Sequence, residues 1–191
     1  MRRFAFLLSC ILLAAGAVSA QVTPSATARQ LSVTAGGMVS IFQPDFEGDW
    51  DAAGQPIAEA SSNALFGAGG YVDLRLSRWV QLEAEGRWLR FNQYSNIHED
   101  NYLAGPRLPV YRFRKATVYG KVLGGFSKMT FDSYGDHGRF TALAFGGGMD
   151  VKVTRRLSIR ALDVEYQYWP EWGNSTLSPY GASVGVGYRI F

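Results

Sequence analysis

Charged side chains that could neutralise one another recur at every second position in several parts of the chain. Residues two apart on an extended chain lie on the same face, so each run presents its acids and bases together. The chemistry open to them is a salt-bridge network, in which buried charges persist because they are paired and hydrogen-bonded. Six acids and six bases share the pattern: Asp73, Arg75, Glu83, Glu85, Arg87, Arg107, Lys121, Asp150, Lys152, Arg160, Asp163 and Glu165.

Other residues of metal-binding or catalytic type fall in polar connecting segments. An acidic run in the first long connection could bind a divalent cation weakly, but it lacks the spacing and turn glycine of an EF-hand loop. His98 and His137 are isolated in later connections, and neither has a serine two residues away on the same face of a strand. We therefore expect no metal site, no cofactor and no catalytic site. The acidic run is Asp45, Glu47, Asp49 and Asp51.

Strict alternation predicts the elements that position the charged residues. In residues 80–88, one face carries Gln81, Glu83, Glu85 and Arg87, while the opposite face is apolar from Val80 to Trp88. This period of two is typical of a β-strand with two different environments on its faces. Eight segments show it: 31–41, 66–75, 80–88, 102–108, 118–126, 143–153, 157–168 and 183–190.

Two strands depart from regular alternation. Arg160 and Asp163 cannot both face inward on a regular strand, so a β-bulge is predicted at Ala161-Leu162. Pro106 and Pro109 lack a backbone N–H, which weakens the ladder of the fourth strand.

Short and long connections alternate between these strands. Short polar turns are expected at 77–79, 113–115 and 154–156, and long connections at 43–62, 93–100, 132–139 and 170–178. Three short and four long connections fit an all-β, eight-stranded, antiparallel up-and-down barrel with both termini on the short-turn side.

Two environments could explain the alternation. In a soluble sandwich or a lipocalin-type barrel, the apolar face is the interior and the charges face water. In a transmembrane β-barrel, the apolar face meets lipid and the charges line the inside. The membrane barrel is favoured because glycine and alanine are frequent on the apolar faces, aromatic residues lie near the segment ends, and the long connections carry little apolar material.

The first twenty residues have the character of a secretory signal peptide. Arg2 and Arg3 precede an apolar run that ends in Val18-Ser19-Ala20, so cleavage is expected before Gln21. The lone cysteine, Cys10, lies within this run, and the mature chain then has no thiol. With 17 basic against 16 acidic residues left after loss of Arg2 and Arg3, no nucleic-acid partner is expected. The predicted organisation is 1–20 signal peptide, 21–29 short N-terminal segment and 30–191 barrel.

The last residues resemble the terminal-strand signal of bacterial outer-membrane barrels, a polar-x-Gly-x-x-aromatic-x-hydrophobic pattern. The residues that carry it are Ser183, Gly185, Tyr188 and Ile190, and Phe191 adds one residue beyond the match. Together with segments 101–107, 145–151 and 157–166, this makes the chain similar to the small OmpA-like outer-membrane β-barrel family over most of residues 31–191.

The resemblance implies a location in the bacterial outer membrane, among lipid and lipopolysaccharide, with assembly by the barrel-assembly machinery through the terminal strand. It implies a monomeric, non-catalytic protein with a structural or surface-interaction role, and the partner of the long loops stays unidentified. The alternative is a small, gated, low-conductance porin-like channel. In that case Arg107 exchanging partners with Glu83 or Glu85 is the expected gate.

Overall fold

Antiparallel strands occupy nearly all of the described chain, which in this computed structural model comprises residues 31–44, 64–91, 97–131, 136–172 and 175–191. The expected signal peptide, the segment 21–29 and the acidic run at 45–51 lie outside these residues. Among the described residues no helix is long and apolar enough to cross a membrane. The strands are β1 (Ser32–Gln43), β2 (Leu65–Arg75), β3 (Gln81–Phe91), β4 (Ile97–Arg112), β5 (Ala116–Phe131), β6 (Asp136–Lys152), β7 (Leu157–Trp172), β8 (Ser175–Leu177) and β9 (Tyr180–Arg189).

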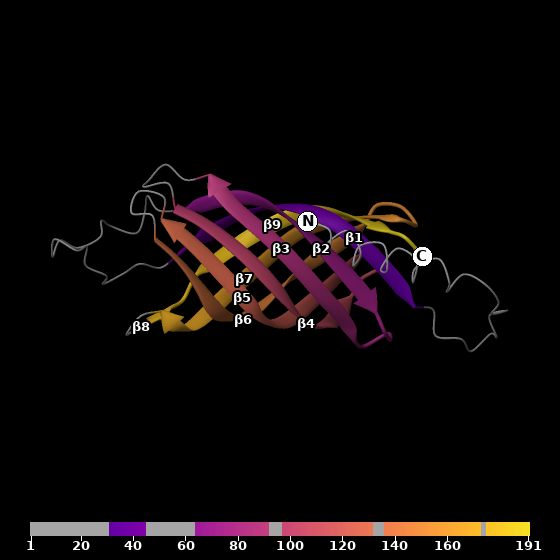
Figure 1. Ribbon diagram of the computed structural model, residues 1–191. Coiled ribbons are helices and arrows are strands. Elements are labelled where there is room, and N and C mark those ends of the chain that lie inside the picture. Colours follow the sequence, from indigo (N-terminus) through magenta and orange to yellow (C-terminus); the bar gives the residue numbers. More distant parts are fainter. Residues whose placement is uncertain (1–30, 45–63, 92–96, 132–135, 173–174) are drawn as a thin grey trace, which may run out of the picture. The chain divides into compact units, whose positions relative to one another are not determined.

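The strands close into a barrel, as the alternation predicts. Each strand from β1 to β7 pairs with the next, β7 pairs with β9, and β9 returns to β1. β8 pairs with β7 just beyond the part of β7 that pairs with β9. β8 and β9 together therefore form the eighth strand of the barrel wall. Figure 1 shows the strands tilted steeply across the wall. In the described chain, closure gives each strand from β1 to β7 and β9 a partner on both sides along the shared part of its length, which satisfies the backbone there without water.

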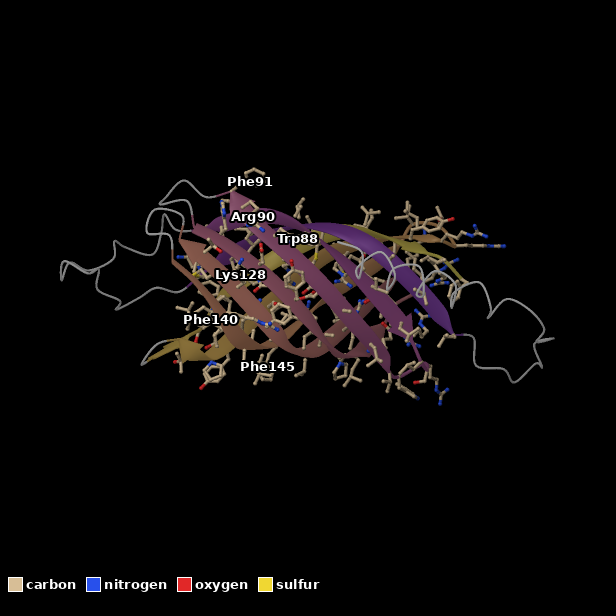
Figure 2. All side chains as sticks on the ribbon, viewed as in Figure 1. Trp88, Arg90, Phe91, Lys128, Phe140 and Phe145 are labelled. Atoms are coloured by element: carbon tan, nitrogen blue, oxygen red, sulfur yellow. The ribbon has the colours of Figure 1, made fainter. Side chains whose placement is uncertain are left out.

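The two faces of the wall carry the residues that alternation assigns to them. On β3, Glu83 is 1% exposed and its neighbour Leu82 is 41% exposed. Aliphatic residues such as Val122 and Val184 cover the middle of the outer wall, and side chains project from it all around (Figure 2). An apolar exterior around a charged interior is the arrangement of a membrane barrel and excludes the soluble alternative.

Exposed aromatic residues flank the aliphatic zone at both ends of the wall. One group lies near the short turns and the other toward the opposite rim, as expected for aromatic girdles at two membrane interfaces. The first group is Trp79, Tyr111, Phe113, Tyr188 and Phe191; the second includes Phe66, Trp88, Phe91, Tyr102, Tyr166, Tyr168 and Tyr180.

Side-chain hydroxyl groups close two of the three short turns. Ser77 Oγ accepts hydrogen bonds from the backbone N–H groups of Trp79 (3.1 Å) and Val80 (3.0 Å). Thr154 Oγ1 does the same for Arg156 (3.2 Å) and Leu157 (2.9 Å). Serine and threonine favour such turns because they offer the backbone a local partner.

The predicted bulge is confirmed, because pairing with both neighbours of β7 shifts register there: Arg160 pairs with Asp150, and Leu162 with Met149. The one extra residue in β7 lets Arg160 and Asp163 face inward together, with 3.2 Å between Arg160 Nη1 and Asp163 Oδ2. The β4–β5 ladder also shifts register between Pro109 and Tyr111, as expected of a strand that contains proline.

The prediction that His98 and His137 lie in loops is wrong. β4 begins at Ile97 and β6 at Asp136, and the register links both histidines to Thr130 of β5. The connections expected at 93–100 and 132–139 are therefore shorter than the sequence suggests. Strand pairing continues past the apolar stretch because backbone hydrogen bonds need no lipid-facing side chains, so hydrophobicity alone does not mark where these strands end.

We expect Val122→Arg, which places a charge in the middle of the outer wall, to lower the free energy of unfolding by about 2–4 kcal/mol. Ile190→Arg, beside the aromatic residues near the chain end, should cost only about 0–1 kcal/mol because the charge reaches the interface. Urea unfolding in phospholipid vesicles measures both. Equal losses would contradict the assigned lipid-facing zone.

Candidate functional site

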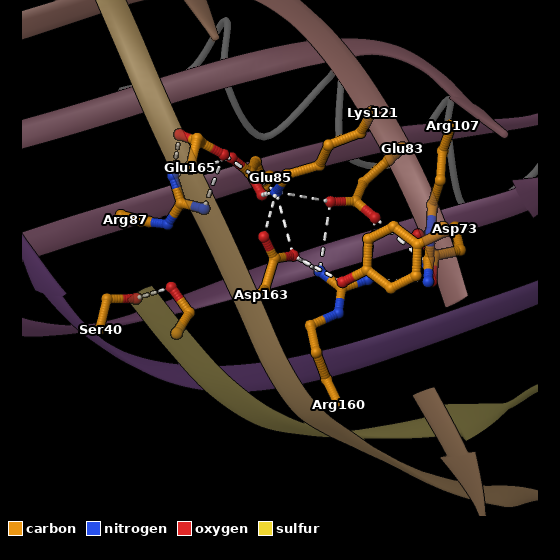
Figure 3. A network of polar contacts seen from close by, with 12 residues as sticks. Ser40, Asp73, Glu83, Glu85, Arg87, Arg107, Lys121, Arg160, Asp163 and Glu165 are labelled. Atoms are coloured by element: carbon orange, nitrogen blue, oxygen red, sulfur yellow. Dashed lines mark hydrogen bonds and ion pairs between the residues drawn. The ribbon is translucent and has the colours of Figure 1, made fainter. Parts of the chain in front are cut away.

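One ammonium group lies at the centre of the barrel interior. Lys121 Nζ on β5 is 3.2 Å from a carboxylate oxygen of Glu83, 3.0 Å from Glu85, 3.1 Å from Asp163 and 2.9 Å from Glu165. Glu83 and Glu85 come from β3, and Asp163 and Glu165 from β7, so the lysine joins three separate parts of the wall (Figure 3). All five side chains are almost completely buried.

Two guanidinium groups extend the network toward the short turns. Arg160 lies 2.8 Å from Glu83 and 3.3 Å from Asp73, and Arg107 lies 2.6 Å from Asp73 and 3.2 Å from Glu83. Arg107 also donates a hydrogen bond to Asp150. The two arginines thus share carboxylates from three strands. Removing either arginine would leave buried carboxylates without one of their cations.

A third guanidinium group extends the network toward the other end. The two terminal nitrogens of Arg87 donate to the two carboxylate oxygens of Glu165, at 2.8 and 3.1 Å, and Arg87 lies 2.9 Å from Glu85. This two-bond geometry is the strongest form of an arginine–carboxylate pair. The ring of Phe42 lies 4.8 Å from the same guanidinium carbon.

Two tyrosines that the sequence analysis did not select support the arginines. The guanidinium of Arg160 lies 3.6 Å from the ring centre of Tyr71, and that of Arg107 lies 3.5 Å from the ring centre of Tyr119. The hydroxyl of Tyr119 also donates to Asp163 at 2.7 Å. Tyr119 is two residues before Lys121 on the same face, so its inward direction follows from the alternation; the stacking does not.

Small residues make room for Tyr71. A Cβ atom on Gly36 would lie 2.6 Å from the Tyr71 hydroxyl oxygen, and one on Gly187 would lie 2.7 Å from it. β1 and β9 therefore need glycine at these positions, because any side chain would displace the ring that carries Arg160.

The structure brings ten of the twelve selected charged residues into one cluster. Four bases, Arg87, Arg107, Lys121 and Arg160, contact six acids. Arg75 and Lys152 form no ion pair with any carboxylate of the described chain and lie at the barrel mouth by the short turns. The sequence pattern has six acids and six bases, but in the structure four bases contact all six acids.

The proposed gate pair also has a defined geometry. Arg107 contacts Glu83 at 3.2 Å, whereas Glu85 is held by Arg87 and Lys121. A partner exchange at Arg107 is thus limited to Asp73, Glu83 and Asp150.

Three carboxylates converge closely enough to serve as metal ligands. Oxygens of Glu83, Glu85 and Asp163 lie within 4.8 Å of one another. The Lys121 ammonium is about 3 Å from all three, so the lysine supplies the positive charge that a cation would bring to the same carboxylates.

Two apolar clusters lie in the barrel interior toward the long connections, beside the buried polar side chains of Glu99, Asn101, Ser127 and Gln167. One cluster is formed by Phe42, Leu65 and Leu89. A second lies against Phe140, whose ring stacks on Trp169 with 5.8 Å between centres. The sequence analysis missed this packing because the residues are inward exceptions within otherwise polar faces. The second cluster comprises Leu103, Leu123, Met129, Ala142, Ala144, Trp169 and Leu177.

The terminal-strand residues lie on both faces of β9 and just beyond it. Ser183 faces inward and hydrogen-bonds Ser40 (2.8 Å), while Tyr188, Ile190 and Phe191 are exposed on the outer wall. Pairing with β1 continues past β9, because Val33 N–H donates to Phe191 O at 3.1 Å. Recognition of this strand by the assembly machinery stays a prediction.

Comparison with known proteins gives consistent results. A family model described as outer membrane protein beta-barrel domain matches residues 10–189. No curated protein sequence matches the chain.

Three solved structures share the fold. Neisserial surface protein A is 13% identical, with a TM-score of 0.56 over 83% of this chain and 96% of its own. OprG from Pseudomonas aeruginosa is 13% identical, with 0.53 over 85% and 97%. The N-terminal β-barrel domain of Pseudomonas aeruginosa OprF is 14% identical, with 0.51 over 84% and 100%. At these identities the likeness shows the fold alone.

We expect Lys121→Met to lower the free energy of unfolding by about 3–5 kcal/mol, because it leaves four buried carboxylates without their shared cation. Lys128→Met is the matched control on the same strand, since Lys128 is exposed on the outer wall. It should change stability by less than about 1 kcal/mol. Urea unfolding in neutral lipid vesicles measures both, and similar values would show that Lys121 is not the centre of the network.

Proposed function

The chain belongs to the outer membrane protein β-barrel domain family, and on that premise we propose that it is a closed, non-catalytic barrel with a structural and surface-interaction role in the bacterial envelope. The observation that carries the proposal is the buried network around Lys121. An eight-stranded barrel is only wide enough for its side chains, and here these side chains are bonded to one another across the interior.

The apolar clusters support the same conclusion from the other end. They lie in the interior beyond Arg87, beside the buried polar side chains of Glu99, Asn101, Ser127 and Gln167, where an ion path would have to continue toward the long connections. An ion crossing the barrel would need to separate the bidentate Arg87–Glu165 pair and then pass apolar packing. Each step has a large desolvation cost, which favours a closed barrel.

We expect the refolded chain to be electrically silent in a planar bilayer. The folding control is a difference in gel migration between boiled and unboiled samples, because a closed barrel resists unravelling. Discrete conductance steps that change in Arg107→Gln or Glu83→Gln would establish the gated channel instead. Steps that do not respond to either variant would place the ion path outside this network and also contradict the proposal.

The outer wall carries a row of cations suited to a lipid surface. Lys128 pairs in register with Asp100 on one side and Arg139 on the other, and Arg90 contacts Asp100 at 2.7 Å. Arg139 lies 3.8 Å from the ring centre of Phe126. Short turns face the periplasm in this kind of barrel, so the row lies at the outer leaflet. We infer that Arg90, Lys128 and Arg139 contact lipopolysaccharide phosphates.

The matching experiment compares thermal unfolding in phospholipid vesicles with and without lipopolysaccharide. Wild type should gain stability, because a ligand that binds the folded state stabilises it. Replacing Arg90, Lys128 and Arg139 by Gln should remove about 1–2 kcal/mol of that gain, as expected for three exposed charge contacts. The control replaces three exposed cations of the short turns, Arg114, Lys115 and Arg155, and should keep the full gain. If both triple variants lost the same part of the stability gain, the gain would depend on net charge and the proposed contacts would be contradicted.

A further inference from the structure

A cavity of about 50 Å³ opens at the short-turn end of the barrel. Every strand from β1 through β7 and β9 contributes to its lining, so the cavity is the mouth of the barrel interior. Its inner limit is the ion pair of Arg107 with Asp73 and Asp150, which belongs to the buried network. The proposed structural role gives this cavity no function.

Three cations line the mouth beyond that pair. They are Arg75 on β2, Lys152 on β6 and Arg189 on β9. None of them forms an ion pair with a carboxylate in the described residues. The two carboxylates in the lining, Asp73 and Asp150, are already held by Arg107 and Arg160. The mouth therefore has a surplus of positive charge.

The geometry leaves donors without partners. The Nε atoms of Arg75 and Arg189 are buried and have no hydrogen-bond partner, like those of Arg87, Arg107 and Arg160 in the network. Thr34, Thr117 and Gln81 add two hydroxyl groups and an amide to the same wall. Cations that line one cavity raise its positive potential and attract anions, so the three cations of the mouth favour an anionic ligand.

We propose that the mouth binds a tetrahedral oxyanion, either inorganic phosphate or a phosphate monoester headgroup, between Arg75, Lys152 and Arg189. A water needs roughly 10–15 Å³ of such volume, so the cavity holds about four oxygen-sized atoms, which is the size of one phosphate group. Guanidinium groups bind phosphate through paired N–H donors, and the lysine adds a point charge. The short turns face the periplasm, where free phosphate and inner-leaflet headgroups are both within reach.

The test is isothermal titration calorimetry of the refolded full chain in a neutral detergent at low ionic strength, with inorganic phosphate as the probe. Wild type should bind one phosphate saturably. Arg75→Gln and Arg189→Gln should each weaken binding at least tenfold, and the double variant should abolish it. Arg155→Gln is the matched control, because Arg155 is an exposed cation at the same end outside the cavity. It should bind like wild type, and boiled and unboiled gel migration confirms that every variant is folded.

A second arm separates the two sources of the oxyanion. Short-chain phosphatidic acid carries a phosphate monoester, and phosphatidylcholine of the same chain length does not. Binding of inorganic phosphate assigns a soluble ligand, whereas binding of phosphatidic acid alone assigns a lipid headgroup. Binding of neither by folded wild type, or an equal loss in Arg155→Gln, would overturn the proposal. These outcomes do not depend on conductance. The proposed phosphate site can therefore be contradicted while the proposed closed barrel holds, and the reverse.

Discussion

The Lys121 ammonium and its four carboxylates are the interaction on which the rest of the interior depends. An eight-stranded barrel in lipid has little water inside, so each inward charge must find its partner across the interior. The carboxylates that Lys121 holds are the same ones that Arg87 and Arg160 use. The wall and the network therefore stabilise each other: the strands place the charges, and the charges connect strands that are not neighbours.

The bulge in β7 shows how far the backbone adapts to this requirement. A regular strand would turn either Arg160 or Asp163 toward lipid, where a charge is costly. One extra residue in the ladder lets both face inward. Gly36 and Gly187 serve the same end, because their lack of a side chain admits Tyr71, which lies against Arg160.

The two ends of the interior differ, and this asymmetry suggests where function resides. Toward the long connections, aromatic and aliphatic clusters pack beside buried polar side chains such as Glu99 and Gln167. Toward the short turns, the network ends in a small cavity with surplus cations. This asymmetry supports the proposed non-conducting barrel, with separate proposed contacts on the outer rim and at the mouth by the short turns.

The sequence by itself determined the class of fold, the face of each strand and the bulge at Ala161-Leu162, because the period of two, proline and charge are local properties. It also selected the inward charges. Only the tertiary structure decided which acid meets which base, since partners such as Lys121 and Glu165 come from strands that do not pair with each other. Only the tertiary structure showed that Arg75 and Lys152 lie outside the network and that His98 lies on a strand. The physical reason is that contacts across a barrel depend on register and tilt around the whole wall, which no single segment encodes.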